Sequence, residues 1–239
     1  MKIIIAGATG YIGQELLSQC LAQNSITAVV ALTRRGLPLT NPKLRTYIME
    51  DKDWLSYSDP DLKAELAGSQ ACLWTIGLTP SKAGKVDEVT AKRVSVEYPA
   101  AAVGAFQRAF LAGDGDGERE GDGDGQRKDK RKFRFVYISG AAAERDQNRS
   151  LWYWRDYRRL RGESENVLLR HSEANKDLFE TYIMRPGPVP TDQGALKNYL
   201  WEMVSSVRLD LLVKTIDVAL NGQPETTLSV QAIRGWAGK

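Results

Sequence analysis

Three glycines near the start of the chain have the spacing of a phosphate-binding turn. Gly7, Gly10 and Gly13 follow the apolar run of residues 2–6 and precede residues 14–22, whose apolar side chains recur at helical spacing. In such a strand–turn–helix unit the first glycine allows a tight turn, the second lets the backbone approach a pyrophosphate, and the third lets the helix pack closely on the strand. The start of the helix adds free N–H groups and the positive end of its dipole. We therefore predict a dinucleotide site rather than a plain turn. Its residues are Gly7, Ala8, Thr9, Gly10, Tyr11, Ile12 and Gly13.

Two arginines stand at the position where a dinucleotide site usually distinguishes NAD from NADP. Residues 27–32 have the pattern of a buried strand, and Arg34 and Arg35 follow it where an NAD site usually carries an acidic residue for the ribose 2′-hydroxyl. Guanidinium groups bind phosphate oxygens bidentately and stay charged. The pair therefore predicts NADP, whose ribose carries a 2′-phosphate. The alternative is two solvated arginines in a loop.

Two further candidates follow the next two strands. Asp51 comes after the strand predicted at 44–49, where an acid commonly faces the adenine, although a solvated loop acid would have the same sequence pattern. Gly77 comes after the strand predicted at 71–76 and would let the chain pass close to a ligand at the carboxyl edge of the sheet. Both residues are therefore assigned to the cofactor site.

Tyr157 and Arg161 stand four residues apart in a predicted helix, so they share one face of it. The helix follows the strand predicted at 133–138 and can deliver both side chains to the nicotinamide half of the ligand. Two plainer interpretations stay open. Tyr157 belongs to the core, or Arg161 forms an ion pair with Glu165 one helical turn later.

The elements that must position these residues alternate along the chain. Strands are predicted at 2–6, 27–32, 44–49, 71–76, 133–138, 180–184 and 226–229. Helices are predicted at 14–22, 60–67, 86–110 with a kink or break near Pro99, 152–172, 210–220 and 230–236. Such alternation indicates a three-layer α/β fold, in which helices cover both faces of a mostly parallel sheet.

The composition of the chain does not favour nucleic-acid binding, metal binding or a membrane span. The chain has 239 residues, 42% of them hydrophobic, and a formal charge of +3, which fits one domain without a basic face for nucleic acid. Cys20 and Cys72 fall in a helix and a buried strand, as expected for reduced thiols of a cytoplasmic protein. His171, the single histidine, is expected on the exposed end of its helix without a second ligand nearby, so no metal is expected. The apolar start, about five residues, is too short for a signal peptide or a membrane span.

Two stretches break the alternation. Residues 113–132 contain no apolar side chain, which predicts a disordered insertion. Its Asp-x-Asp start suggests a calcium loop, but Arg119 occupies the sixth position, where glycine is required. Residues 186–205 are predicted to form a small substrate lid, whose prolines and aromatic residues favour an apolar or aromatic substrate. The alternatives of lining that pocket or packing in the core are left open for Trp152, Trp154 and Trp201.

Four motifs together resemble those of short-chain dehydrogenases and reductases of the atypical or extended type, close to the NmrA-like group. They are the turn at 7–13, Thr33-Arg34-Arg35, Tyr157-x-x-x-Arg161-Gly162-Glu163-x-Glu165 and Arg185-Pro186-Gly187. The resemblance implies a seven-stranded Rossmann sheet, NADP as cofactor, a small-molecule substrate, and Tyr157 as proton donor or acceptor beside the hydride. It also implies that Pro186 contacts the cofactor and that two copies of the chain pair as a homodimer.

Two positions depart from the pattern of this family. Arg161 replaces a lysine that binds the nicotinamide ribose, and Gly140 stands where a serine usually hydrogen-bonds the substrate carbonyl, with Ser139 one residue earlier. With Ser139, Tyr157 and Arg161 as the catalytic set, the resemblance implies an NADPH-dependent reductase of a small carbonyl or an activated double bond. The departures keep two alternatives open, a regulator that senses NADP without turnover and a redox-neutral isomerase or epimerase.

Overall fold

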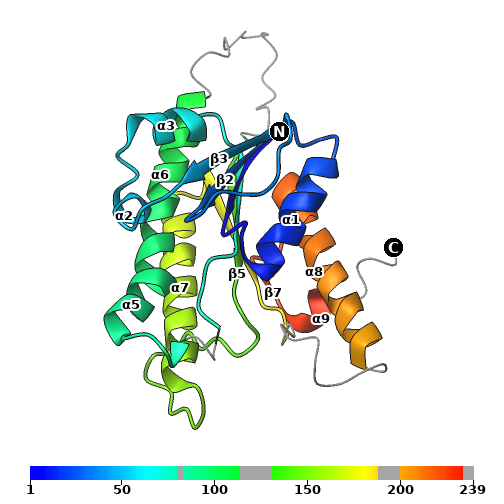
Figure 1. The fold of residues 1–239 in the computed structure, drawn as a ribbon. Coiled ribbons are helices and arrows are strands. Elements are labelled where there is room, and N and C mark those ends of the chain that lie inside the picture. The colour runs from blue at the N-terminus through cyan, green and yellow to red at the C-terminus, as the bar shows by residue number, and fades with distance from the viewer. Residues whose placement is uncertain (80–82, 114–130, 188–199, 234–239) are drawn as a thin grey trace, which may run out of the picture.

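A seven-stranded parallel sheet forms the centre of the protein in the computed structural model, which describes residues 1–79, 83–113, 131–187 and 200–233, with the backbone alone for 200–210. The strands are β1 (Lys2–Ala6), β2 (Ala28–Thr33), β3 (Leu44–Ile48), β4 (Ala71–Trp74), β5 (Phe133–Ile138), β6 (Phe179–Met184) and β7 (Thr227–Leu228). Their order is β3-β2-β1-β4-β5-β6-β7, and every neighbouring pair is parallel. The predicted α/β Rossmann architecture is confirmed (Figure 1).

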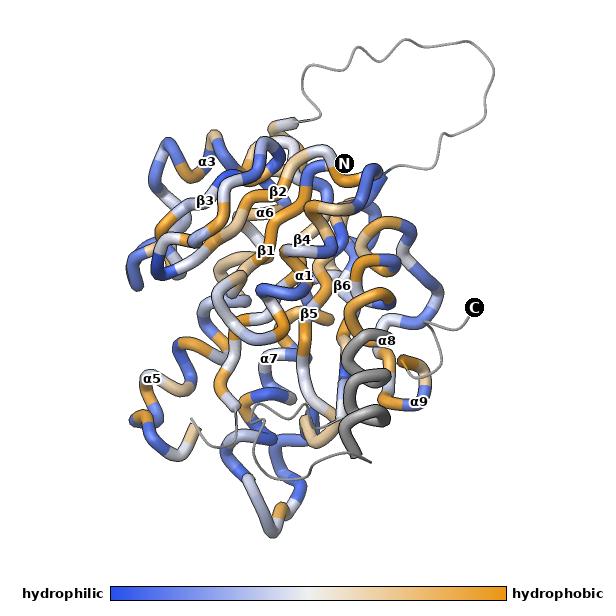
Figure 2. The backbone as a smooth tube through the Cα atoms, turned by 45° about the vertical axis from the view of Figure 1, so that its right-hand side comes forward, coloured by the Kyte–Doolittle hydropathy of each residue, from blue (hydrophilic) through white to orange (hydrophobic). Residues whose placement is uncertain are grey.

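Helices cover both faces of this sheet. On one face lie α1 (Tyr11–Ala22), α8 (Leu200–Asn221) and α9 (Val230–Ile233). On the other lie α2 (Asp53–Ser56), α3 (Pro60–Leu66), α5 (Glu88–Lys92), α6 (Tyr98–Gly113) and α7 (Arg155–Ala174). Successive residues of β1 point to opposite faces, because side chains alternate along a strand. Ile4 therefore packs in the cluster that contains Phe106 of α6, and Ile3 packs in the cluster that contains Leu16 of α1. Figure 2 shows this apolar character concentrated in the central strands.

The long helix predicted at 86–110, with a kink or break near Pro99, is divided by a π-helical turn, Arg93–Glu97, which ends two residues before this proline. Pro99 has no N–H, so the carbonyl of Ser95, four residues earlier, loses its usual helical partner. The hydroxyl of Ser164 on α7 donates a hydrogen bond to this carbonyl instead. The proline therefore creates an attachment point between α7 and the π-helical turn that precedes α6.

Several predicted boundaries shift. The opening helix begins at Tyr11, immediately after the glycine turn, and β4 ends at Trp74. The helix predicted from residue 152 begins at Arg155, because Trp154 has a left-handed backbone with φ 47°. The predicted cap of α3 is confirmed, since the side chain of Asp59 accepts hydrogen bonds from the N–H groups of residues 61 and 62.

Some predictions fall outside the described residues. The predicted insertion at 113–132 and the predicted lid at 186–205 do so over most of their length, as do the side chain of Trp201 and the end of the helix predicted at 230–236.

Both cysteines are free and buried, as predicted for core thiols. Burial raises the pKa of the Cys20 thiol to about 12. Within the described parts of the chain, no helix is both long enough and apolar enough to span a bilayer.

Candidate functional site

The glycine turn has the conformation that its spacing predicts. Gly7 has a left-handed backbone with φ 91°, and the N–H of Gly10 donates to the Gly7 carbonyl over 2.9 Å. A side chain at Gly13 would collide with the same carbonyl. Any larger residue at this third position would therefore push α1 away from the turn.

The amino end of α1 is open toward this turn. Its N-cap residue is Gly10, which has no side chain to satisfy the first N–H groups of the helix. These donors and the helix dipole form a cradle that suits the pyrophosphate of a dinucleotide. The residues present therefore fit the predicted cofactor.

Arg34 and Arg35 lie exposed directly after the end of β2. The hydroxyl of Thr33 donates to the Arg35 carbonyl over 2.6 Å and so holds the start of the loop. Across the described ranges of the chain, neither guanidinium takes part in an ion pair. Both charges are thus available to an anionic ligand at this edge of the sheet.

Asp51 is exposed but has a partner. Its carboxylate accepts a hydrogen bond of 3.1 Å from the hydroxyl of Tyr98, whose ring stacks on Trp54. Burial, then the hydrogen bond from its hydroxyl to Asp51, raises the pKa of Tyr98, against smaller opposing effects of Arg93 and Arg34. The Tyr98 contact therefore holds Asp51 in place, and its role in the cofactor site stays a prediction.

Arg161 is buried between the carboxyl ends of β4 and β5, with 8% of its surface exposed. Its Nη1 donates to the Tyr137 hydroxyl and the Ile138 carbonyl, both at 3.2 Å, and its Nη2 donates to the Leu78 carbonyl at 3.0 Å. A side chain at Gly77 would lie 2.5 to 2.7 Å from atoms of this guanidinium. Gly77 therefore makes room for Arg161, a reason that the sequence did not indicate.

Tyr157 is half-buried and lies over the start of the loop that follows β5. Its hydroxyl oxygen is 3.3 Å from the position that a Cβ of Gly140 would occupy. The guanidinium carbon of Arg161 lies 5.7 Å from the centre of the Tyr157 ring. Tyr157, Arg161, Gly140 and Gly77 are therefore brought together at the carboxyl edge of the sheet, where Tyr157 is half-buried and Arg161 is buried.

The alternative interpretation, in which Arg161 forms an ion pair with Glu165, is wrong, because Glu165 has other partners. Glu165 is completely buried and accepts hydrogen bonds from the Ser139 hydroxyl (2.6 Å), Arg145 Nε (2.6 Å) and Arg185 Nε (2.9 Å). Arg145 also donates to the Thr227 hydroxyl over 2.9 Å. We call Glu165, Ser139, Arg145 and Arg185 the Glu165 cluster. It ties α7 to the ends of β5 and β6 and to β7.

This cluster also gives Ser139 a use that was not predicted. Ser139 was assigned to catalysis, but its hydroxyl donates to a carboxylate in the interior. The sequence signal for the cluster was incomplete, because the partners of Glu165 lie 20 to 26 residues away along the chain. The motif of α7 contains Glu165, but its spacing indicates no partner outside the helix.

With this geometry in hand, comparison with solved structures is informative. A short-chain dehydrogenase from Burkholderia cenocepacia J2315 in complex with NADP superposes with a TM-score of 0.59 at 13% identity, over 97% of this chain and 90% of that one. Serine dehydrogenase from Escherichia coli gives 0.61 at 16% identity, over 96% of both chains. Gre2 from Candida albicans in complex with NADPH gives 0.61 at 15% identity, over 96% of this chain and 77% of that one. The fold is that of the short-chain dehydrogenases.

Sequence comparison reaches less far. The leucinostatins biosynthesis cluster protein T of Purpureocillium lilacinum is 32% identical over 77 residues, which is 32% of this chain and 28% of that protein. The mitochondrial protein FMP52 of Candida albicans is 26% identical over 101 residues, 42% of this chain and 44% of that protein. The matches thus span less than half the length of these curated relatives. No family model matches the chain.

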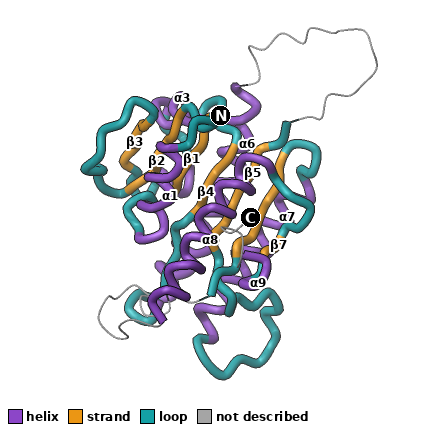
Figure 3. Tube along the Cα trace, turned by 90° about the vertical axis from the view of Figure 1, so that its right-hand side faces the viewer, coloured by secondary structure: helices purple, strands orange, loops and turns teal. Residues whose placement is uncertain are grey.

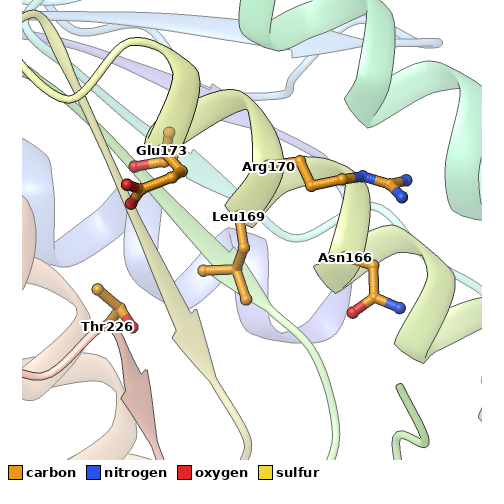
Figure 4. Close-up of a pocket in the computed structure, with 6 residues that line it drawn as sticks. Asn166, Leu169, Arg170, Glu173 and Thr226 are labelled. Carbon is orange, nitrogen blue, oxygen red and sulfur yellow. The ribbon is translucent and has the colours of Figure 1, made fainter. Parts of the chain in front are cut away.

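A second concave region lies away from the carboxyl edge of the sheet. An open hollow of about 530 Å³ separates the later turns of α7 from the residue before β7, and Figure 4 shows its side chains. It is lined by Asn166, Leu169, Arg170, Ser172, Glu173 and Thr226. Its lining begins more than two helical turns after Tyr157, so we do not assign the chemistry to it.

His171 is half-buried rather than exposed, which corrects the prediction. Its Nε2 lies 2.8 Å from Gln107 Oε1, and its ring meets the ring of Phe179 edge-on at 4.8 Å. Burial lowers the pKa of His171. Among the residues that the structure describes, no three His, Cys, Asp or Glu side chains form a group that could hold a metal ion.

Proposed function

We propose that the chain binds NADP(H) and reduces a small carbonyl or an activated double bond, with Tyr157 as the proton donor. The observation that carries this proposal is the position of the Tyr157 hydroxyl. It lies beside Gly140 at the carboxyl edge of the sheet, and the buried guanidinium of Arg161 lies next to its ring. In open α/β sheets, ligands bind at this edge.

The cofactor is assigned to the residues that fit it. The glycine turn and the open amino end of α1 would bind the pyrophosphate, and Asp51 would face the adenine. Arg34 and Arg35 are proposed to bind a 2′-phosphate, which favours NADP over NAD. Gly77 and Pro186 flank the nicotinamide half in this assignment. When bound, the nicotinamide supplies the hydride.

Two groups of the chain perform the remaining step. Tyr157 donates its hydroxyl proton to the substrate atom that gains negative charge. Arg161 stabilises the charge left on the phenol oxygen, because its own charge is permanent and is held in a site largely shielded from water. Arg161 donates three hydrogen bonds, to the carbonyls of Leu78 and Ile138 and to the hydroxyl of Tyr137, and these restrict its movement. We therefore assign it a positioning and electrostatic role.

The test combines turnover with cofactor binding. Purified protein is assayed for NADPH oxidation with a panel of small aldehydes, ketones and α,β-unsaturated carbonyls. The variant Tyr157→Phe should lower kcat by about 10²- to 10⁴-fold, the usual contribution of a positioned acid, while its Kd for NADPH stays unchanged. Tyr153→Phe, four residues earlier in the loop before α7 and exposed, is the matched control and should leave kcat unchanged. Turnover retained in Tyr157→Phe would reject the catalytic role.

One observation favours a second candidate, a protein that binds NADP to regulate a partner without turnover. Gly140 offers no hydroxyl beside Tyr157, and the neighbouring Ser139 hydroxyl donates to Glu165. The groups that would polarise a substrate carbonyl are thus reduced to the phenol alone. On this alternative, the amount of a co-purifying partner should differ between NADPH and NADP⁺. A pull-down that responds to neither form would count against it.

A further inference from the structure

Three consecutive aromatic residues form an exposed tip on the loop between β5 and α7. The exposed fractions are 97% for Trp152, 58% for Tyr153 and 58% for Trp154. This loop projects beyond the helices at the foot of the molecule in Figure 1, and the side view of Figure 3 shows the same projection. Large aromatic side chains are normally buried or held in an interface, so such a tip requires an explanation.

The tip is held in place rather than loosely extended. Arg158 on the first turn of α7 lies over the Tyr153 ring, 4.8 Å from its centre, and donates through Nε to the Ala142 carbonyl over 2.8 Å. The Gln147 side chain donates to three carbonyls of the loop and of α7. Trp154 adopts a left-handed backbone that a bulky residue rarely takes. The loop therefore presents its aromatic residues in a fixed arrangement.

Arginines surround these aromatic side chains. Arg149, Arg155, Arg158 and Arg159 lie within five positions of the tip, a stretch in which Asp156 is the one carboxylate. Arg149 is paired with Glu144, and Arg155 is paired with Asp156. The surroundings of the tip therefore keep a positive charge. Tryptophan and tyrosine flanked by arginine are suited to the headgroup layer of a membrane, where the rings meet acyl chains and the guanidiniums meet phosphates.

The area that the tip can bury distinguishes a membrane from a protein as its partner. At about 150–250 Å² for each fully buried aromatic side chain, the three exposed parts can bury less than the roughly 800 Å² that a stable protein interface needs from each partner. A small tip is sufficient for a bilayer, because tryptophan and tyrosine side chains sit at the level of the headgroups. We propose that the 152–154 tip docks the protein on the surface of an anionic lipid bilayer.

The experiment measures binding to vesicles by co-sedimentation, with the full chain. Wild-type protein should bind phosphatidylcholine vesicles that contain phosphatidylserine, and less so phosphatidylcholine alone. The double variant Trp152→Ser/Trp154→Asn should lose about tenfold or more in partition coefficient, since asparagine tolerates the left-handed backbone at 154. Arg155→Gln should lose about fivefold on the anionic vesicles alone, one charge near the surface.

Leu111→Ser is the matched control. Leu111 is also exposed, at 44%, but lies near the carboxyl end of α6, at the opposite pole of the molecule, so its variant should bind as wild type does. Circular dichroism and the melting temperature check that each variant is folded. The proposal is overturned if the double variant binds as wild type does. It is also overturned if wild type binds neither kind of vesicle and instead self-associates through the tip, with self-association lost in the double variant.

Discussion

Glu165 allows a sharp test of what holds the carboxyl edge of the sheet together. In Glu165→Ala, two guanidiniums and the Ser139 hydroxyl lose their shared acceptor. Removing one partner of a buried ion pair costs about 3–5 kcal/mol. The side chains of Arg145 and Arg185 are 34% and 23% exposed and can regain water, so we expect the lower limit, about 3 kcal/mol.

The assay is chemical denaturation, with the melting temperature as a second readout. A loss of about 3 kcal/mol corresponds to a decrease of about 6–12 °C for a domain of this size. Glu163→Ala is the matched control. It removes the same side chain from the same helix, and Glu163 forms no ion pair within the described ranges, so its effect should stay within about 0.5 kcal/mol.

A double-mutant cycle identifies the source of the loss. If the cluster acts through its charges, Glu165→Ala and Arg145→Ala should be non-additive by about 0.5–3 kcal/mol. Equal small losses in Glu165→Ala and Glu163→Ala, or strict additivity in the cycle, would refute the reasoning that the buried carboxylate holds these strand ends.

The remaining predictions concern the proposed cofactor site at the carboxyl edge of the sheet and the buried thiol of Cys20. The double variant Arg34→Ala/Arg35→Ala should raise the Kd for NADPH about tenfold or more and leave that for NADH nearly unchanged, as measured by fluorescence titration. Equal effects on both would reject the 2′-phosphate assignment. Gly77→Ala should destabilise the fold by about 1–3 kcal/mol in denaturation, because the Arg161 guanidinium must move, whereas Gly84→Ala meets open space and should not. The Cys20 thiol should resist a thiol reagent at pH 8 until the chain is unfolded. Its folded pKa, about 12, lies above its usual 9.0, so its contribution to stability is complete below pH 9 and decreases as pH rises toward 12, which denaturation in alkaline buffers can measure.

Local features of the chain were predictable because their causes are local. The glycine turn depends on three glycines within seven consecutive residues. The pair Asp59 and Pro60 is sufficient to start α3. The shared face of Tyr157 and Arg161 follows from helical geometry alone. In each case the physical cause lies within a few residues, so the sequence is enough.

Contacts made across the sheet could not be derived in this way. The reason for Gly77 is a guanidinium 84 residues later in the chain, and the carbonyl freed by Pro99 is satisfied by a hydroxyl of another helix. Strand order decides which of these groups meet, and alternation of strands and helices specifies the class of fold without specifying that order.

The arrangement along α7 links the chemistry of the proposed site to its architecture. Tyr157, Arg161 and Glu165 follow one another at four-residue intervals, so they occupy one stripe of the helix and enter the sheet at successive depths. The first is half-buried, the second is held by carbonyls beyond β4 and at the end of β5, and the third is fully buried. A shift of the buried end of this stripe therefore displaces the end that carries Tyr157. This is why arginine at position 161 differs from lysine in kind: its planar donors are used to join two strand ends, and its charge is thereby fixed beside the phenol.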